Sequence, residues 1–333
     1  MAGPDHATWF RIDHESVIGA ARRAAVRLAR QIAFPESRAG EVAIAVSEVA
    51  ANLYRHADEG TLLIRIVRVD GRAGIGVVAA DRGPGMIDAG ASRRDGHSTG
   101  GTLGIGLGAI ERLASWLEVA SVPGAGTVLA LEFWDGSAPS RPLAACLCRP
   151  MTGQEVSGDA IAIRQVDGRV VLLAVDGLGH GPLAARAADT AVRVFEDEPF
   201  TSAATTMSSL HRALRSTRGA AIAVADIDAK GRVRYAGIGN IAGWIVDEEG
   251  SRRGLVSMPG IAGHQIRRVQ ELEYELPARS RVVLHSDGLT SKWSTSPALL
   301  RRDPIVGAAV LLRDAGTRRD DASVVVAETP CTL

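Results

Sequence analysis

A short run of turn-forming residues near the middle of the chain divides it into two parts. Residues 135–142 read Asp-Gly-Ser-Ala-Pro-Ser-Arg-Pro, and such a density of glycine, serine and proline is typical of a linker or an exposed turn. The chain has 333 residues, which suits two domains of about 150 residues each. We therefore expect one domain over residues 1–135, a linker over 136–142 and a second domain over 143–333.

The composition is that of a folded protein without a bias toward polyanionic partners. Hydrophobic residues make up 46% of the chain and charged residues 23%, which excludes a disordered or low-complexity scaffold. The 38 lysines and arginines balance the 38 aspartates and glutamates, so net charge gives no support for a nucleic-acid or membrane partner. The sequence opens without a cationic segment followed by an apolar run, and we expect a cytoplasmic protein.

The first part is predicted to be an α/β domain with an antiparallel sheet. Two long helices are expected first, over residues 14–33 and 35–57. Asp70-Gly71, a dipeptide favoured in tight hairpins, separates the first two strands. The strands are expected over 61–69, 74–80, 117–122 and 126–134, and a third helix over 105–117.

Residues 98–108, Ser-Thr-Gly-Gly-Thr-Leu-Gly-Ile-Gly-Leu-Gly, form the densest glycine cluster in the chain. A P-loop would end in Gly-Lys-Ser/Thr, and this run has no lysine. A dinucleotide fingerprint would follow a strand directly, whereas the preceding residues 88–97 are polar and turn-like. What remains is a loop that leads into a helix N-terminus, where backbone N–H groups and the helix dipole can hold phosphates.

Polar residues upstream of this loop can complete a nucleotide site. Glu48 and Asn52 are one turn apart on the helix predicted over 35–57 and share a face. Asn52 offers a neutral oxygen to Mg²⁺, and Glu48 can accept a proton from an attacking hydroxyl. In Asp81-Arg-Gly-Pro-Gly85 the aspartate can accept a hydrogen bond from an exocyclic amine. The alternative is that Glu48 and Asn52 are solvated surface residues.

In this order, the Glu–Asn helix, the Asp-x-Gly-x-Gly motif, the glycine loop and a closing Gly-x-Gly-Thr at 124–127 resemble the GHKL ATPase family, and within it the anti-sigma-factor serine kinases. The resemblance covers residues of about 8–134 and implies a GHKL (Bergerat) α/β sandwich that uses ATP and Mg²⁺. It implies that Glu48 is the general base, that Asn52 holds Mg²⁺ and that Asp81 recognises adenine. The further nucleotide-binding residues that it implies are Gly83, Gly85, Gly100, Gly101, Gly104, Gly106, Leu107, Gly108 and Thr127.

The second part is predicted to consist of many strands and few helices, which favours a β-sandwich flanked by helices. Aspartates stand at the ends of its apolar strands: Asp159, Asp176, Asp287 and Asp320. A charged carboxylate at the end of a buried strand costs free energy unless it is solvated or bound to a cation. Four such carboxylates therefore suggest a shared site. Two divalent ions about 3.5–4 Å apart can activate a water and clamp a phosphoryl group, which predicts metal-assisted phosphoester hydrolysis.

Four motifs of this part resemble those of the metal-dependent PPM-type serine/threonine phosphatases, in the bacterial branch that includes sporulation stage II proteins. They are Ser157-Gly-Asp159, Asp176-Gly-Leu-Gly-His-Gly181, Ser286-Asp-Gly-Leu-Thr290 and Asp320-Asp-Ala-Ser323. The resemblance spans residues of about 141–327 and implies an αββα sandwich with two Mn²⁺ or Mg²⁺ ions. The catalytic metal ligands that it implies are Asp159, Asp176, Asp287, Asp320 and the carbonyl of Gly177.

Several assignments in the second part stay open. Asp321 is an alternative to Asp320, because adjacent residues of an extended segment face opposite ways. His180 could donate a proton to the leaving serine oxygen, or it could cap or pack the following helix. Asp228 is expected to be a turn residue, and Asn240 to serve a turn through its tolerance of positive φ.

Together the two resemblances imply a fused protein-serine/threonine kinase and phosphatase of a bacterial partner-switching pathway that regulates a sigma factor. The expected substrate of both activities is a STAS-domain regulator with a reversible phosphoserine or phosphothreonine. The alternative is that the ATP-binding domain only binds: it would sequester a sigma factor or set the activity of the attached phosphatase. We expect no nucleic-acid or membrane partner.

Overall fold

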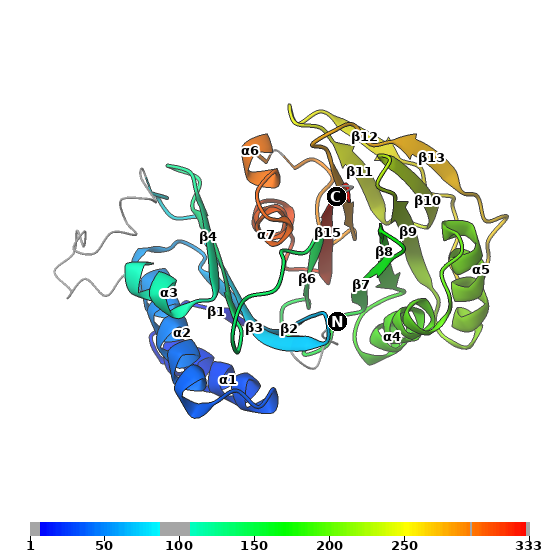
Figure 1. Cartoon of the computed structure of the whole chain (residues 1–333). Coiled ribbons are helices and arrows are strands. Elements are labelled where there is room, and N and C mark those ends of the chain that lie inside the picture. The colour runs from blue at the N-terminus through cyan, green and yellow to red at the C-terminus, as the bar shows by residue number, and fades with distance from the viewer. Residues whose placement is uncertain (1–6, 87–106, 294, 331–333) are drawn as a thin grey trace. The chain divides into compact units, whose positions relative to one another are not determined.

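The computed structural model describes residues 7–86, 107–293 and 295–330 (Figure 1). The chain forms two compact units, residues 1–141 and 142–333. The division therefore falls within the run of glycine, serine and proline residues at 135–142.

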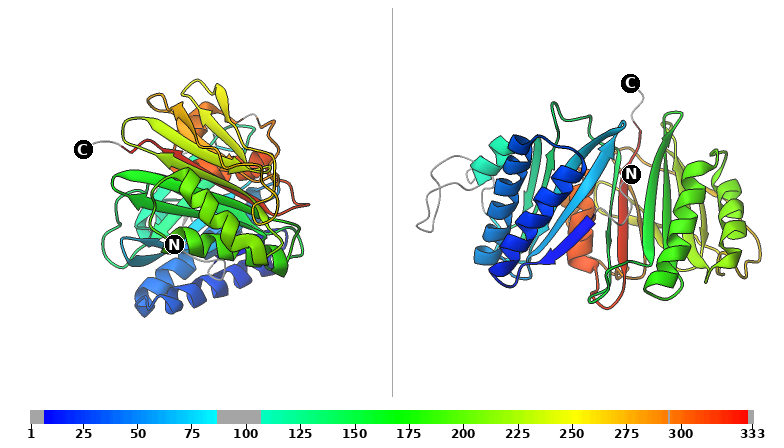
Figure 2. Two further views of the ribbon diagram at one scale, coloured as in Figure 1. Left: turned by 90° about the vertical axis from the view of Figure 1, so that its right-hand side faces the viewer. Right: turned by 90° about the horizontal axis from the view of Figure 1, so that it is seen from below.

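The first unit is a five-stranded antiparallel sheet with helices against one face. Its strand order is β1-β2-β3-β5-β4. The strands are β1 (Ala7–Arg11), β2 (Thr61–Val69), β3 (Arg72–Ala80), β4 (Trp116–Ser121) and β5 (Thr127–Phe133). The helices are α1 (Ser16–Gln31), α2 (Glu36–His56) and α3 (Leu107–Leu113). Helices α1 and α2, drawn in blue, lie side by side along the sheet (Figure 2).

Hydrophobic periodicity accounts for this packing. Alternate residues of β2, such as Leu62 and Ile64, are fully buried in the same cluster as Val46 and Val49 of α2. Because strand side chains alternate between faces and helix side chains return to one face every three to four residues, these two patterns bring one helix face against one sheet face. Glu48 is next to the buried Val49 in α2 and is itself half-buried.

The second unit is an αββα sandwich of two five-stranded antiparallel sheets. One sheet has the order β13-β10-β9-β8-β7 and the other β12-β11-β14-β15-β6. The strands of the first are β7 (Asp159–Val166), β8 (Arg169–Gly177), β9 (Ala220–Ile227), β10 (Arg232–Ile238) and β13 (Leu272–Glu275). Those of the second are β6 (Ala144–Arg149), β11 (Ala242–Val246), β12 (Arg252–Leu255), β14 (Arg281–His285) and β15 (Ala322–Glu328).

Helices cover both outer faces of this sandwich. Helix α4 (Pro182–Asp197) and α5 (Ala203–Ala213), followed by the 3₁₀ turn η3 (Leu214–Ser216), pack on the first sheet. Helix α7 (Pro304–Ala315) packs on β15 and β6 of the other sheet, and the short α6 (Pro297–Leu300) contacts α7 (Figure 1). The mixed α/β fold predicted for both parts is confirmed.

The ends of some elements differ from the sequence-based expectations. The N-cap of α1 is Glu15, without a side-chain cap, so this helix begins two residues later than the predicted range 14–33. The helix predicted over 105–117 ends at Leu113, because Ser115 N–H donates to the Glu132 carbonyl (2.8 Å) and the chain enters the sheet there. Strand β1 and helix α6 were not expected, since both are short and lack a long periodic pattern.

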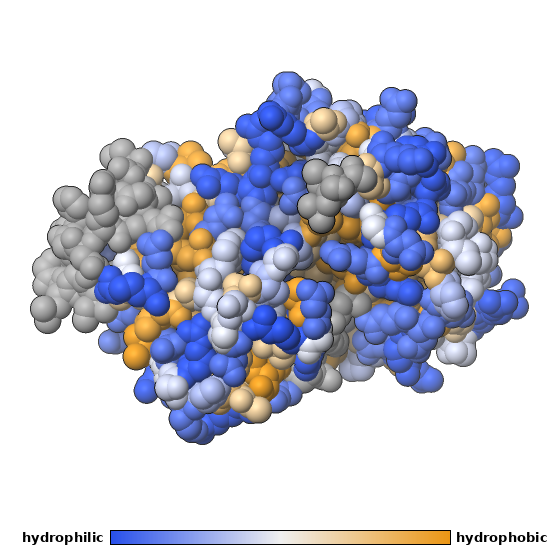
Figure 3. Space-filling model, viewed as in Figure 1, coloured by the Kyte–Doolittle hydropathy of each residue, from blue (hydrophilic) through white to orange (hydrophobic). Residues whose placement is uncertain are grey.

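No helix in the described parts of the chain is long and apolar enough to cross a membrane. The face drawn in Figure 3 is largely hydrophilic, with smaller hydrophobic areas between the polar residues.

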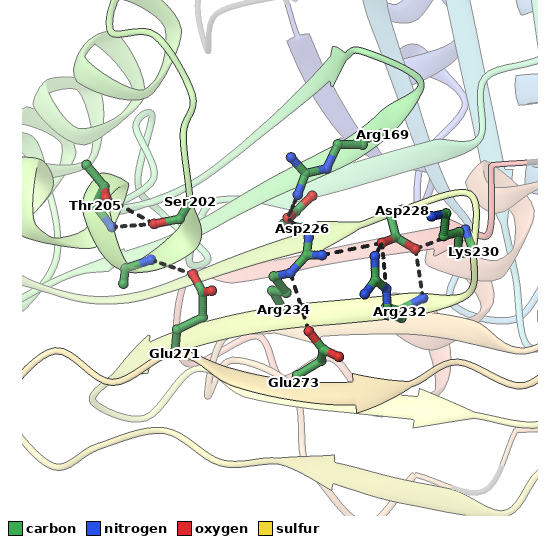
Figure 4. Close-up of polar contacts among 11 residues, drawn as sticks. Arg169, Ser202, Thr205, Asp226, Asp228, Lys230, Arg232, Arg234, Glu271 and Glu273 are labelled. Atoms are coloured by element: carbon green, nitrogen blue, oxygen red, sulfur yellow. Dashed lines mark hydrogen bonds and ion pairs between the residues drawn. The ribbon is translucent and has the colours of Figure 1, made fainter.

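A buried carboxylate holds a row of charges across the first sheet of the sandwich (Figure 4). Asp226 on β9 is fully buried and pairs with Arg169 on β8 and with Arg234 on β10, whose Nη1 lies 3.0 Å from Asp226 Oδ2. Arg234 also pairs with Glu273 on β13 at 3.4 Å. Burial raises the pKa of the Asp226 carboxyl, and the two arginines oppose that rise.

Replacing Asp226 by alanine is expected to lower the free energy of unfolding by about 3 kcal/mol, because two partly buried arginines lose their shared partner. Chemical denaturation measures this loss. The matched variant Glu273→Ala, whose side chain is 56% exposed, is expected to cost less than about 1 kcal/mol. A loss for Asp226→Ala no greater than that for Glu273→Ala would show that the row is not a stabilising network.

Candidate nucleotide and carboxylate sites

Helix α2 carries the two residues predicted to act on a nucleotide. Glu48 and Asn52 are both half-buried and lie one turn apart. The start of this helix is held by Arg38, which pairs with Glu41 and donates to the Leu113 carbonyl at 2.8 Å. Since Leu113 ends α3, this arginine ties α2 to the helix that follows the glycine loop.

The Asp-x-Gly-x-Gly motif after β3 is ordered by backbone hydrogen bonds. Oδ1 of Asp81 accepts from the N–H groups of Gly83 (2.8 Å) and Thr127 (3.3 Å), so its carboxylate has a set orientation. A Cβ on Gly83 would lie 2.8 Å from the His56 carbonyl at the end of α2, which places the motif one turn beyond Asn52. Gly85 has φ +68°, and a Cβ there would lie 2.2 Å from the Val122 carbonyl, so only glycine fits.

Part of the predicted phosphate loop lies outside the described residues. This applies to Gly100, Gly101, Gly104 and Gly106. Leu107 and Gly108 are described: they form the first turn of α3, and Gly108 is buried. Helix α3 packs on α2, so these two residues stand on the helix beside the one that bears Glu48 and Asn52.

In the second unit, strand pairing brings the predicted carboxylates together. Asp159 begins β7 and Asp176 stands near the end of β8, and the two are directly opposite in the antiparallel ladder. Asp287 follows β14 and Asp320 precedes β15, at the ends of paired strands in the other sheet. The charges of Asp159, Asp287 and Asp320 all act on Asp176, so the four groups are electrostatic neighbours.

These carboxylates are poorly compensated by the protein itself. Burial raises the pKa of Asp176 to about 8, and the three neighbouring carboxylates add to the rise. Burial likewise raises the pKa of Asp159 to about 7, although the hydroxyls of Ser286 and Ser323 oppose it. Oδ2 of Asp159 is buried without a hydrogen-bond partner among the described residues. Buried carboxylate oxygens that accept no hydrogen bond and lie beside other carboxylates suit a divalent cation as ligands, because the cation neutralises their charges.

Gly177 follows Asp176 and is closely packed. Its N–H donates to the Gly158 carbonyl (3.0 Å), and a Cβ on Gly177 would lie 2.4 Å from the Ala184 carbonyl in α4. The close approach holds the strand end against the start of the helix, and any side chain would force the two apart. The backbone that follows Asp176 is therefore fixed in position.

The structure separates the roles of Asp320 and Asp321. Asp321 is buried, and its two carboxylate oxygens accept from the N–H groups of Met151 (2.7 Å) and Gly158 (2.6 Å). Asp320 is exposed, and its charge acts on Asp176 and Asp287. The geometry therefore gives Asp321 a structural task and leaves Asp320 at the cluster.

Asn240 is a site residue that sequence reasoning missed. It was expected to adopt positive φ in a turn, but that conformation belongs to Gly239 (φ +92°), so the expectation is wrong. Its side-chain amide donates to Asp287 Oδ2 (2.8 Å) and also lowers the pKa of Asp176 through a hydrogen bond. His180 is exposed, and the N-cap of α4 is Gly181 without a side-chain cap, so the capping or packing role considered for His180 is wrong as well. Asp228 does cap a turn, accepting from Lys230 N–H (2.9 Å), as expected.

The carboxylates are neighbours without converging on one point. Among the described residues, no three acidic, histidine or cysteine side chains are arranged as a ready metal centre. Carboxylates without a counter-ion repel one another, which is a physical reason why they do not converge. The Asn240 amide forms hydrogen bonds with two of them, Asp176 and Asp287.

The raised pKa values of Asp159 and Asp176 predict a pH-dependent stability. Because the folded protein holds these protons more tightly than the unfolded chain, this contribution is present below about pH 4 and is lost as pH rises toward about 8. In EDTA, we expect the Asp176→Asn variant to melt at least about 5 °C above the wild type at pH 8 and close to it at pH 5. Thermal melts at both pH values measure the difference, and an equal difference at pH 5 and pH 8 would contradict it.

Comparisons with known proteins agree with the division of the chain. Residues 10–133 match the family described as histidine kinase-like ATPase domain, and residues 166–304 match that of stage II sporulation protein E (SpoIIE). The serine/threonine-protein kinase RsbT of Bacillus subtilis (strain 168) is 36% identical over 124 residues, which are 37% of this chain and 93% of RsbT.

Solved structures match as well. One comes from a study of the bacterial stressosome as a modular system adapted to control secondary messenger signalling. It is 29% identical and covers 56% of this chain and 98% of its own, with a TM-score of 0.51. A structure of RsbX in complex with magnesium is 16% identical and covers 55% of this chain and 92% of its own, with a TM-score of 0.48. Through its first unit the chain thus belongs to the histidine kinase-like ATPase domain family and is related to RsbT, and residues 166–304 of its second unit are similar to stage II sporulation protein E (SpoIIE).

Proposed function

We propose that this chain is a protein-serine/threonine kinase and phosphatase in one polypeptide, and that it acts on a STAS-domain regulator of a partner-switching pathway. The observation that carries the proposal is the presence of two separate groups of oxygen-bearing side chains, one in each unit. One unit, related to the kinase RsbT, holds Glu48 and Asn52 on one helix face, and the other gathers four aspartates from the strand ends of two sheets.

In the phosphatase unit, the proposed ligands of two Mn²⁺ or Mg²⁺ ions are Asp159, Asp176, Asp287, Asp320 and the Gly177 carbonyl. Bound divalent ions would supply an activated water and neutralise the phosphoryl oxygens. The protein's own part is to orient the carboxylates: Asn240 holds Asp287, and Asp321 holds the Gly158 backbone next to Asp159. In the hydrolysis, an O–P bond forms to water, the bond to the serine or threonine oxygen breaks, and that oxygen takes up a proton.

In the kinase unit, Glu48 would accept the proton of the substrate hydroxyl as its oxygen attacks the γ-phosphorus of ATP. Asn52, one turn away, would supply the oxygen for Mg²⁺. Asp81 would accept a hydrogen bond from the adenine amine, and its carboxylate is already held by two backbone N–H groups. Gly83, Gly85 and Thr127 would complete the base pocket, with Gly100, Gly101, Gly104, Gly106, Leu107 and Gly108 around the phosphates.

A steady-state assay tests the combination. Wild type and Asp176→Asn are each incubated with labelled ATP, Mg²⁺, Mn²⁺ and a purified STAS-domain protein. The variant is expected to accumulate several times more phosphoprotein than the wild type, because phosphorylation continues while hydrolysis is lost. Equal levels in the two reactions would contradict opposed activities in this chain.

A further inference from the structure

A group of exposed cations lies next to the carboxylate cluster of the second unit. It comes from α5, the residues after it and the loop before β13, and we call it the basic surface. Its members are Arg212, Arg215, Arg218, His264, Arg267 and Arg268.

The fold brings these two segments together by direct contacts. Gly263 N–H donates to Nδ1 of His211 in α5 (3.0 Å), and a Cβ on Gly263 would lie 2.7 Å from the Leu214 carbonyl in η3. Ala220 and Ala262 exchange backbone hydrogen bonds of 3.0 and 2.9 Å just beyond. Burial lowers the pKa of His211, and Arg215 and His264 lower it further, so both of these side chains lie near His211.

The basic surface borders the carboxylates. Nη1 of Arg218 lies 3.3 Å from the position of a Cβ on Gly179, in the loop that follows Asp176. In the same loop Leu178 N–H donates to the Gly219 carbonyl (3.0 Å), and Gly177 pairs with Ala220 in the ladder. A ligand with its phosphate at the carboxylate cluster therefore has Arg218 beside it.

The charges of this surface are not used within the described parts of the chain. None of its five arginines forms an ion pair with a described residue, and the sequence has no acidic residue over 199–225 or 250–270. In the same unit, Arg169, Arg234 and Arg281 all pair with carboxylates. Repulsion among cations without an acidic partner opposes folding, so this surface, with Arg218 beside the loop that follows Asp176, favours a role in binding an anion.

We propose that the basic surface binds an acidic segment of the phosphoprotein substrate, next to the phosphorylated side chain. This rests on the proposed phosphatase function. A phosphoprotein fits better than a nucleic acid or an anionic membrane, because the adjoining carboxylates would repel a continuous polyanion. Leu178 and Leu183, 48% and 51% exposed, stand on the loop and at the start of α4, where a folded protein partner can cover them.

Two synthetic phosphopeptides test the proposal. Both have a central phosphoserine, flanked in one by four glutamates and in the other by four glutamines. The full chain with Mn²⁺ is expected to hydrolyse the acidic peptide with a kcat/KM about tenfold higher, mainly through a lower KM, and 0.5 M NaCl is expected to remove the preference. The double variant Arg212→Glu/Arg215→Glu, which keeps Arg218 beside the phosphate position, is expected to abolish it.

Two controls make the result interpretable. The double variant Lys230→Glu/Arg279→Glu alters exposed cations at the opposite strand ends and is expected to keep the preference. Hydrolysis of p-nitrophenyl phosphate, which has no flanking residues, is expected to be equal in all three proteins. If the wild type cleaves p-nitrophenyl phosphate but hydrolyses the two peptides at equal rates, this inference fails while the proposed phosphatase function stands. The inference also fails if the arginine double variant keeps the preference for the acidic peptide and loses only binding to vesicles with anionic lipid. Absence of hydrolysis of every phosphoester would overturn the proposed phosphatase function.

Discussion

Replacing Asp176 by asparagine is expected to lower kcat/KM for hydrolysis of p-nitrophenyl phosphate with Mn²⁺ by about 10³-fold, or about 4 kcal/mol of activation free energy. The cause is the loss of a negative oxygen ligand at the centre of the cluster, since Asp176 is the group on which the charges of Asp159, Asp287 and Asp320 all act. Calorimetric titration should also show weaker Mn²⁺ binding. The fold should persist, because removal of this charge relieves repulsion in the metal-free protein.

The matched control for this change is Asp167→Asn. Asp167 stands in the β7–β8 turn with φ +50°, a conformation that asparagine tolerates, so this variant is expected to retain wild-type hydrolysis. Asp176→Asn with more than one third of the wild-type kcat/KM would refute the ligand assignment. Comparing Asp320→Asn with the wild type tests the fourth ligand in the same assay, whereas Asp321 is unsuitable because two backbone N–H groups depend on it.

Replacing Glu48 by glutamine is expected to lower transfer of the γ-phosphate to a STAS protein by about 10²- to 10⁴-fold, the range of a positioned general base. ATP binding should change little, because the amide has the same shape and Glu48 is not a proposed nucleotide ligand. The Asn52→Ala variant should instead lose Mg²⁺-dependent ATP binding, because it removes the proposed metal oxygen. Single-turnover transfer and equilibrium ATP binding distinguish the two effects.

The control for Glu48 is Glu36→Gln, at the exposed start of the same helix, where Glu36 pairs with Arg30 at 3.1 Å. It is expected to leave transfer and binding unchanged. If the wild type binds ATP but transfers no phosphate, or if Glu48→Gln transfers at the wild-type rate, the first unit is a binding module rather than a kinase. That result would leave the phosphatase proposal intact.

Local patterns predicted the elements of this protein well. The predicted range 61–69 coincides with β2, and 35–57 exceeds α2 by one residue at each end, because strong alternation or helical spacing marks a buried face. The expectations that failed concern residues whose neighbours are distant in sequence. Asn240 was read from its own turn, but its partner Asp287 is 47 residues away.

The amino-acid sequence by itself determined the two-part organisation, the β-sandwich flanked by helices in the second part and the candidate acids, since periodicity, turn residues and motif spacing are local properties of a chain. Only the tertiary structure decided which acids meet. In the folded chain Asp321 accepts a hydrogen bond from the Gly158 N–H group, Asp320 stays near the other carboxylates, and Arg218 lies beside Gly179 in the loop after Asp176. The physical reason is that such contacts depend on which strand ends of different sheets lie next to each other. The residues adjacent in sequence do not determine the distance between those strand ends.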